Sequence, residues 1–131
     1  MKISTKGRYA LTIMLDIAKK YNTDEFVSIN NIAEKENISH KYLERIVAIL
    51  KKKGLVKSST GVSGGYKLTK APKNYTIGEI IRAAEENLNV VDCIEKGKCP
   101  KKSSCKTYGL WEGLNKELND YLDNKTLEDY M

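Results

Sequence analysis

Residues 39–54 read Ser-His-Lys-Tyr-Leu-Glu-Arg-Ile-Val-Ala-Ile-Leu-Lys-Lys-Lys-Gly, and this stretch decides the fold. Its apolar side chains recur at the spacing of one face of an α-helix. They are Leu43, Ile46, Val47 and Leu50. Ser39 is a suitable N-cap residue and Gly54 a suitable residue just past the C-terminus. The stretch therefore predicts a helix with a defined start and end.

The other faces of this helix carry side chains that can contact DNA from a rigid support. They are His40, Lys41, Tyr42, Glu44, Arg45, Lys51 and Lys52. Taken alone, the same pattern also fits an amphipathic surface helix with solvated lysines. The flanking sequence has to decide between the two interpretations.

Two further helices are predicted upstream. Ser4 or Thr5 can cap the first, and Ser28 the second, a short one. The first has a stripe made of Ala10, Ile13, Met14, Ile17, Ala18 and Tyr21, with Leu11 and Leu15 on another side; the second turns Ile29, Ile32 and Ala33 inward. The short helix and the one after Ser39 meet across a turn of about three or four residues, as in a helix-turn-helix, although this turn lacks the usual glycine.

Downstream, the periodicity changes to that of a β-hairpin. Residues 55–59 and 66–70 are strand-like, and Thr60–Gly65 between them is rich in glycine, which lets backbone approach phosphate closely. A nucleotide-binding loop does not fit, because no Gly-Lys-Ser/Thr follows the glycines and a strand comes next. Helix-turn-helix followed by a hairpin is the winged-helix order. The predicted fold class is mainly α with a small β-hairpin wing.

The rest of the chain predicts two more helices. Thr76 and Glu79 fit a capping box for a helix with Ile77, Ile80, Ile81 and Ala84 inward. Residues 106–123 give a last stripe, made of Leu110, Trp111, Leu114, Leu118, Tyr121 and Leu122. A helix after a small winged domain has little surface of its own chain to cover, so we expect a dimer interface, with Leu11 and Leu15 contributing.

These predictions divide the chain into three parts. A winged helix-turn-helix DNA-binding domain spans 1–86, a cysteine-containing cluster loop spans 87–106, and a dimerisation helix with the C-terminal tail spans 107–131. A dimer with two-fold symmetry reads paired half-sites, so we expect a palindromic operator in double-stranded DNA.

Charge supports the same division. The chain has a net charge of +6, and residues 1–70 hold 14 Lys and Arg against 6 Asp and Glu, whereas residues 71–131 hold 9 against 11. The basic half predicts a polyanion partner. The apolar runs are too short to span a membrane and no signal peptide is evident, so we expect a cytoplasmic protein. No pairing of catalytic residue types supports an enzyme.

Three cysteines, Cys93, Cys99 and Cys105, are each separated by five residues in a polar, lysine-rich loop. They cannot all pair internally, and such a loop buries little. Thiolates beside lysines suit a soft metal or an iron-sulfur cluster. Structural zinc usually has a Cys-x2-Cys pair or a nearby histidine, and the one histidine is His40. Spacing alone leaves a cluster, zinc and a simple thiol sensor open.

Taken together, these motifs resemble the iron-sulfur cluster regulators, the IscR-like winged-helix transcription factors. The resemblance covers nearly the whole chain and rests on Ser4–Ala10, Tyr42-Leu43-Glu44, Gly64-Gly65-Tyr66, the three cysteines and Leu110-Trp111. It implies a homodimer with a 2Fe-2S cluster on Cys93, Cys99 and Cys105, which controls genes of cluster assembly or of sulfur and cysteine metabolism. The start of the chain is also similar to cysteine-metabolism repressors, which lack the cysteines and act through a partner enzyme.

Three positions depart from the family pattern. Tyr108 stands where a histidine usually completes the ligand set, Arg8 where nitric-oxide sensors have an aspartate, and Thr60 where many relatives have a wing arginine. The fourth ligand stays open between Tyr108, a carboxylate such as Asp92 or Glu112, a small thiol or water, and a group of the other subunit.

The expected DNA-binding residues come from the helix at 39–54 and from the wing. They are Ser39, His40, Lys41, Tyr42, Glu44, Arg45, Ser59, Thr60, Gly61, Ser63 and Gly64. Glu44 is repelled by phosphate but can accept a hydrogen bond from a cytosine amino group, so it can discriminate between sites. The alternative function is a cluster-free repressor of cysteine metabolism, regulated through a partner enzyme or a small thiol.

Overall fold

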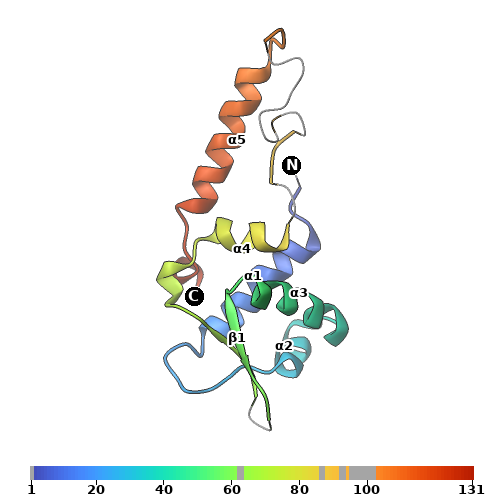
Figure 1. The fold of residues 1–131 in the computed structure, drawn as a ribbon, viewed down its shortest axis with the longest axis vertical. Helices are drawn as coiled ribbons and strands as arrows, with labels where there is room; N and C mark the ends of the chain where they lie inside the picture. Colours follow the sequence, from blue (N-terminus) through green and yellow to red (C-terminus); the bar gives the residue numbers. More distant parts are fainter. Residues whose placement is uncertain (1, 62–63, 86–87, 92–93, 95–102) are drawn as a thin grey trace.

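The computed structural model describes residues 2–61, 64–85, 88–91, 94 and 103–131. Its elements run in the predicted order and confirm a mainly α fold with a hairpin wing (Figure 1). They are α1 (Thr5–Ala18), α2 (Ile29–Glu36), α3 (His40–Lys52), β1 (Val56–Ser59), β2 (Gly65–Leu68), η1 (Pro72–Asn74), α4 (Ile77–Ala84), α5 (Tyr108–Asp123) and η3 (Glu128–Tyr130).

The predicted caps start four of the helices. Each cap side chain accepts a hydrogen bond from the backbone N–H three residues further on: Ser4, Ser28, Ser39 and Thr76. The turn between α2 and α3 uses Asn37 in the left-handed region, φ 53° and ψ 48°, where a glycine is common. Gly54, at φ 77°, follows the end of α3 as predicted. The helix-turn-helix is therefore set by local sequence.

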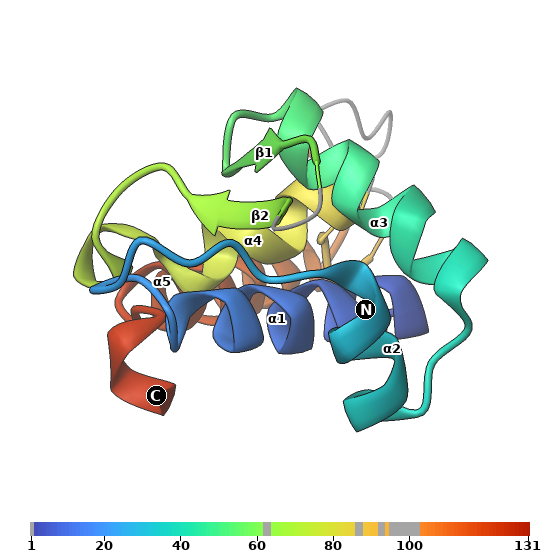
Figure 2. The ribbon, with the colours of Figure 1, turned by 90° about the horizontal axis from the view of Figure 1, so that it is seen from below.

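The core is built around α1. Ala10, Ile13 and Met14 are fully buried, and α1 packs against α3, α4 and β2. Figure 2 shows α1 along one side of the body, with α3 and the hairpin on the other. Leu127 is also fully buried in this core. The tail after α5 thus returns to the winged part of the molecule.

The wing is a two-stranded antiparallel hairpin in which Val56 pairs with Leu68 and Ser59 with Gly65. Each strand has four residues, fewer than predicted. Val27 adds one bridge on the free edge of β2, where its backbone exchanges two hydrogen bonds of 2.8 Å with Tyr66. The hairpin and α5 lie at opposite ends of the molecule (Figure 1).

Two helix boundaries differ from the predicted ones. α1 ends at Ala18, so Tyr21 lies in the following turn instead of on the helix. The Lys20 and Tyr21 amides bond to carbonyls three residues back, which tightens the chain out of the α-helix. α5 begins at Tyr108, two residues later than predicted.

One carboxylate, Asp16 of α1, is buried, with 9% of its surface exposed. Its Oδ1 accepts a 2.8 Å hydrogen bond from Lys35 Nζ. Contact with Asp16, and secondly burial, raises the pKa of Glu36. Asp16 Oδ2 is buried and finds no hydrogen-bond partner among the described residues. The carboxyl groups of Glu36 and Asp16 therefore interact, and this interaction favours the protonated form of Glu36.

We therefore expect Glu36→Gln to raise the melting temperature at pH about 7. The pKa of Glu36 is higher in the folded chain than in the unfolded chain. The stabilisation from protonated Glu36 is thus full below the unfolded value and lost as pH rises through the folded value. The gain over wild type should shrink toward about pH 4, near the ordinary glutamate pKa. Thermal unfolding at both pH values measures this. A gain that does not depend on pH, or an equal gain in Glu34→Gln on the same helix, would contradict it.

Candidate nucleic-acid interface

The start of α3 presents its predicted contacts to solvent. His40, Lys41, Glu44 and Arg45 are all exposed. His40 and Glu44 lie one turn apart and pair at 3.4 Å between Nδ1 and Oε1, and Lys41 and Arg45 have the same spacing. One face of α3 therefore carries the His40–Glu44 pair, and the adjacent face carries the two cations Lys41 and Arg45.

Two other predicted contacts on α3 also have structural roles. Ser39 Oγ caps the helix by accepting from the Tyr42 amide at 3.1 Å. The half-buried Tyr42 ring stacks edge-on against Tyr9 of α1, with ring centroids 5.7 Å apart and planes at 84°. Ser39 therefore sets the start of α3, and Tyr42 helps to hold α3 against α1.

The wing lies beside the start of α3. A groove of about 280 Å³ lies between the wing and the starts of α2 and α3, and its lining includes His40, Ser59, Thr60 and Gly64. It also contains residues at the start of α2, which sequence reasoning did not select: Ser28, Ile29 and Asn30. Gly61, at φ 106°, is exposed. Ser63 lies outside the described residues. Helix and wing residues that are far apart in sequence thus form one surface.

A wider hollow of about 670 Å³ flanks the opposite side of α3. Ser4, Thr5 and Lys6 line it together with Tyr42, Arg45, Ala84 and Glu85. The N-terminus of α1 thus lies close to α3. Sequence reasoning missed this neighbour, although Lys6 beside a helix start is a phosphate-binding pattern that could have indicated it.

Glu85 fixes that N-terminus. Its Oε1 accepts a 2.7 Å hydrogen bond from the Ser4 amide and a short one from the Ser4 hydroxyl. A Cβ on Gly7 would come within 2.5 Å of the same oxygen. A side chain at position 7 would have to displace the end of the Glu85 side chain, and glycine leaves room for this contact between the end of α4 and the start of α1.

We expect the effect of Gly7→Ala to change sign with the residue at position 85. In the wild-type chain it should destabilise by about 1 kcal/mol, because displacing Glu85 loses hydrogen bonds that outweigh the better helix propensity of alanine. In a Glu85→Ala background it should stabilise by about 0.5–1 kcal/mol. Urea unfolding of the double-mutant cycle measures both values, and additive effects would contradict the contact.

The cysteine segment is described only in part. Cys93 and Cys99 lie outside the described residues. Cys105 is half-buried, and its Sγ lies 3.6 Å from Thr107 Oγ1, immediately before α5. The N-terminus of a sixteen-residue helix carries partial positive charge, which favours a thiolate or an anionic cluster. Within the part of the chain that the structure describes, no three His, Cys, Asp or Glu side chains gather.

Two candidates for a fourth ligand are described. Tyr108 is buried, with 8% of its surface exposed, at the first position of α5. Glu112, one turn further on, is exposed. Asp92 lies outside the described residues.

α5 stands away from the body (Figure 1). Part of its apolar stripe is exposed. Leu110, Leu114 and Tyr121 are 61%, 42% and 59% exposed. Arg82 of α4 fixes the other end of α5 through two hydrogen bonds to Asp123, at 2.7 and 3.0 Å. Among the described residues, no helix is long and apolar enough to cross a membrane.

A winged fold with an exposed basic α3 is the arrangement of a DNA-binding protein. The model of one such family, Rrf2, described as an iron-dependent transcriptional regulator, matches residues 3–131. The chain belongs to the Rrf2 family. Its fold and the resemblance stated from its motifs are thereby confirmed.

Among the proteins that the chain resembles are regulators named IscR and CymR. The HTH-type transcriptional regulator IscR of Klebsiella pneumoniae (strain 342) is 40% identical over 127 residues, which cover 97% of this chain and 77% of the relative. The structure of CymR (YrzC), the global cysteine regulator of B. subtilis, matches with a TM-score of 0.81 and 41% identity over 99% of this chain and 95% of that one.

A third relative, the structure of T. potens IscR, gives a TM-score of 0.79 and 36% identity, covering 99% of this chain and 85% of that one. This Rrf2 protein is thus a transcriptional regulator similar to both IscR and CymR.

Proposed function

We propose that this Rrf2 regulator is a cytoplasmic homodimer that binds a palindromic operator, and that a 2Fe-2S cluster on Cys93, Cys99 and Cys105 sets its DNA affinity. The observation that carries the DNA-binding part is the surface shared by α3 and the wing, where His40, Ser59 and Thr60 line one groove. The controlled genes are those of iron-sulfur assembly or of sulfur and cysteine metabolism.

From the exposed faces of α3, Lys41 and Arg45 enter the major groove, and Glu44 accepts from a cytosine amino group. The wing residues Ser59–Gly64 contact the sugar-phosphate backbone, where glycines permit close approach. Thr60 in place of an arginine makes the wing contact a backbone contact rather than a minor-groove one.

The exposed stripe of α5 supports the homodimer. Leu110, Leu114 and Tyr121 are spaced so that they share one face of the helix. Three large apolar side chains that stay exposed on one helix face are typical of an interface. A second copy of the same face is the partner that gives a two-fold axis, and hence a palindromic site.

Cys105 is the described residue that would hold the cluster, with Cys93 and Cys99 as the others. Its place before α5 supports this role, because the helix N-terminus stabilises the negative charge of the thiolate. When bound, such a cluster supplies a redox-sensitive group beside the N-terminus of the dimerisation helix. The fourth ligand is unassigned.

Anaerobic purification tests the cluster. We expect a brown protein with visible absorption and with iron and inorganic sulfide in equal amounts, and Cys105→Ser should lose both. If iron and sulfide are absent, and a triple Cys→Ser variant binds DNA like wild type in vivo, the cluster is excluded.

The second candidate function is a cluster-free repressor of cysteine metabolism that responds to a partner enzyme or a small thiol. It is favoured by the fit to CymR and by Tyr108 at the position where the iron-sulfur regulators have histidine. The same iron and sulfide measurement separates the two candidates. The DNA-binding surface is common to both.

A further inference from the structure

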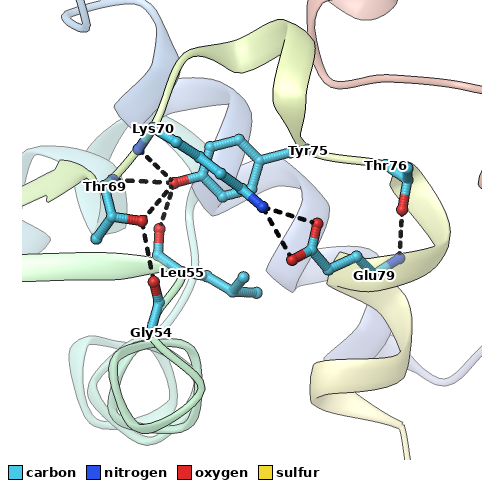
Figure 3. A network of polar contacts seen from close by, with 7 residues as sticks. All are labelled: Gly54, Leu55, Thr69, Lys70, Tyr75, Thr76 and Glu79. Carbon is cyan, nitrogen blue, oxygen red and sulfur yellow. Dashed lines mark hydrogen bonds and ion pairs between the residues drawn. The ribbon is translucent and has the colours of Figure 1, made fainter.

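Tyr75 lies between η1 and α4 and is fully buried. Its carbonyl accepts a 3.0 Å hydrogen bond from the amide of Leu127 in the segment that follows α5, and the amide of Ile77, two residues on, donates to the Lys125 carbonyl of the same segment at 2.8 Å. Its side chain extends to the base of the wing (Figure 3). One residue thus contacts the end of the α5 arm and the root of the wing.

The hydroxyl of Tyr75 bonds to the residue before β1 and to the residue after β2, which together form the root of the wing. It donates to the Leu55 carbonyl at 2.7 Å, just before β1, and accepts from the Thr69 amide at 2.9 Å, just after β2. Thr69 Oγ1 lies 3.1 Å from the same oxygen and donates to the Gly54 carbonyl at 2.9 Å. Because Gly54 and Leu55 follow α3 directly, these bonds also fix the wing root to the end of the recognition helix.

A second link reinforces the first. Lys70 Nζ lies 4.7 Å from the centre of the Tyr75 ring and donates to both carboxylate oxygens of Glu79, at 3.1 and 3.3 Å (Figure 3). Glu79 is in the first turn of α4, so this ion pair ties the wing root to α4. The pair is more than one third exposed, and water weakens it. The buried hydroxyl is therefore the stronger of the two links.

We propose that Tyr75 is a positioning residue for the wing. This inference rests on the proposed DNA binding and extends it. The wing and α3 must contact the same duplex at once, so the angle between them determines whether the wing reaches the backbone. The Tyr75 hydroxyl sets that angle. The Tyr75 backbone, which is hydrogen-bonded to Leu127, couples the angle to the position of the segment after α5. No contact of Tyr75 with DNA is involved.

The test uses the full chain with Tyr75→Phe, which keeps the ring and removes the hydroxyl. The probe is a duplex selected from random sequences by the wild-type protein. We expect affinity to fall about tenfold, as for the loss of one charge-assisted contact. Hydroxyl-radical protection should be lost where the wing lies, while methylation protection of guanines under α3 is retained. Tyr21→Phe, in the turn after α1, is the matched control and should bind like wild type.

Thr69→Val tests the same link from the exposed side and keeps Tyr75 intact. The hydroxyl-radical protection at the wing should fall in this variant too, by less than in Tyr75→Phe. If Tyr75→Phe does not fold, Thr69→Val alone tests the positioning role. A folded Tyr75→Phe protein with unchanged wing protection overturns the positioning role, and so does equal loss of both protections. If the wild-type protein selects no duplex, the proposed function itself is wrong.

Discussion

Replacing Arg45 with alanine should lower the affinity for the operator by roughly 10- to 100-fold and leave non-specific DNA binding nearly unchanged. Arg45 is exposed on α3, one turn after Lys41, at the position expected to reach base edges. A bidentate arginine–base contact is worth about 1–3 kcal/mol of discrimination, which corresponds to that range. Fluorescence anisotropy with an operator duplex and a scrambled duplex of equal length measures both affinities.

Lys52→Ala is the matched control for this prediction. Lys52 is exposed in the last turn of the same helix, and a lysine that contacts phosphate contributes to all sequences alike. The control should weaken both duplexes equally. Equal losses for Arg45→Ala would mean that Arg45 also contacts only phosphate, and the groove assignment would be wrong.

The second large effect is expected from a charge on the exposed stripe of α5. Leu110→Glu should convert the dimer to a monomer, because each subunit would bury a carboxylate against the apolar face of its partner. DNA affinity should then fall by roughly a hundredfold or more, since the second half-site is no longer engaged by a linked subunit. Analytical ultracentrifugation and the operator titration measure the two effects.

Lys116→Gln provides the control on another face of α5, where Lys116 is largely exposed and pairs with Asp120. It should remain dimeric. A Leu110→Glu protein that stays dimeric and binds its operator normally would show that the interface lies elsewhere.

Local features of the fold were predictable from the sequence. Ser28, Ser39 and Thr76 act on backbone groups three residues away, so their capping roles follow from neighbouring residues alone. The stripe of α3 predicts its buried face because helical spacing fixes which side chains point the same way. The role of Asn37 was harder to predict, because a glycine is the stronger signal for that turn.

Contacts between distant residues could not be predicted in this way. Glu85 meets Ser4, and Tyr75 meets Leu55, across 81 and 20 positions. Neither contact leaves a periodic trace in the sequence. Leu127 reaches the core through a turn after α5, although its segment looks like a tail. For the candidate DNA-binding site, the winged-helix order predicts the hairpin beside the helix, whereas the contribution of the start of α2 to the groove depends on tertiary packing.

The central claim is that two chains bind one duplex through basic surfaces. The most direct measurement is a titration of a selected palindromic duplex with the protein at several salt concentrations. The account predicts two chains per duplex and an affinity whose logarithm falls linearly with the logarithm of the salt concentration, because phosphate contacts release counterions. One chain per duplex, or an affinity that does not depend on salt, would contradict it.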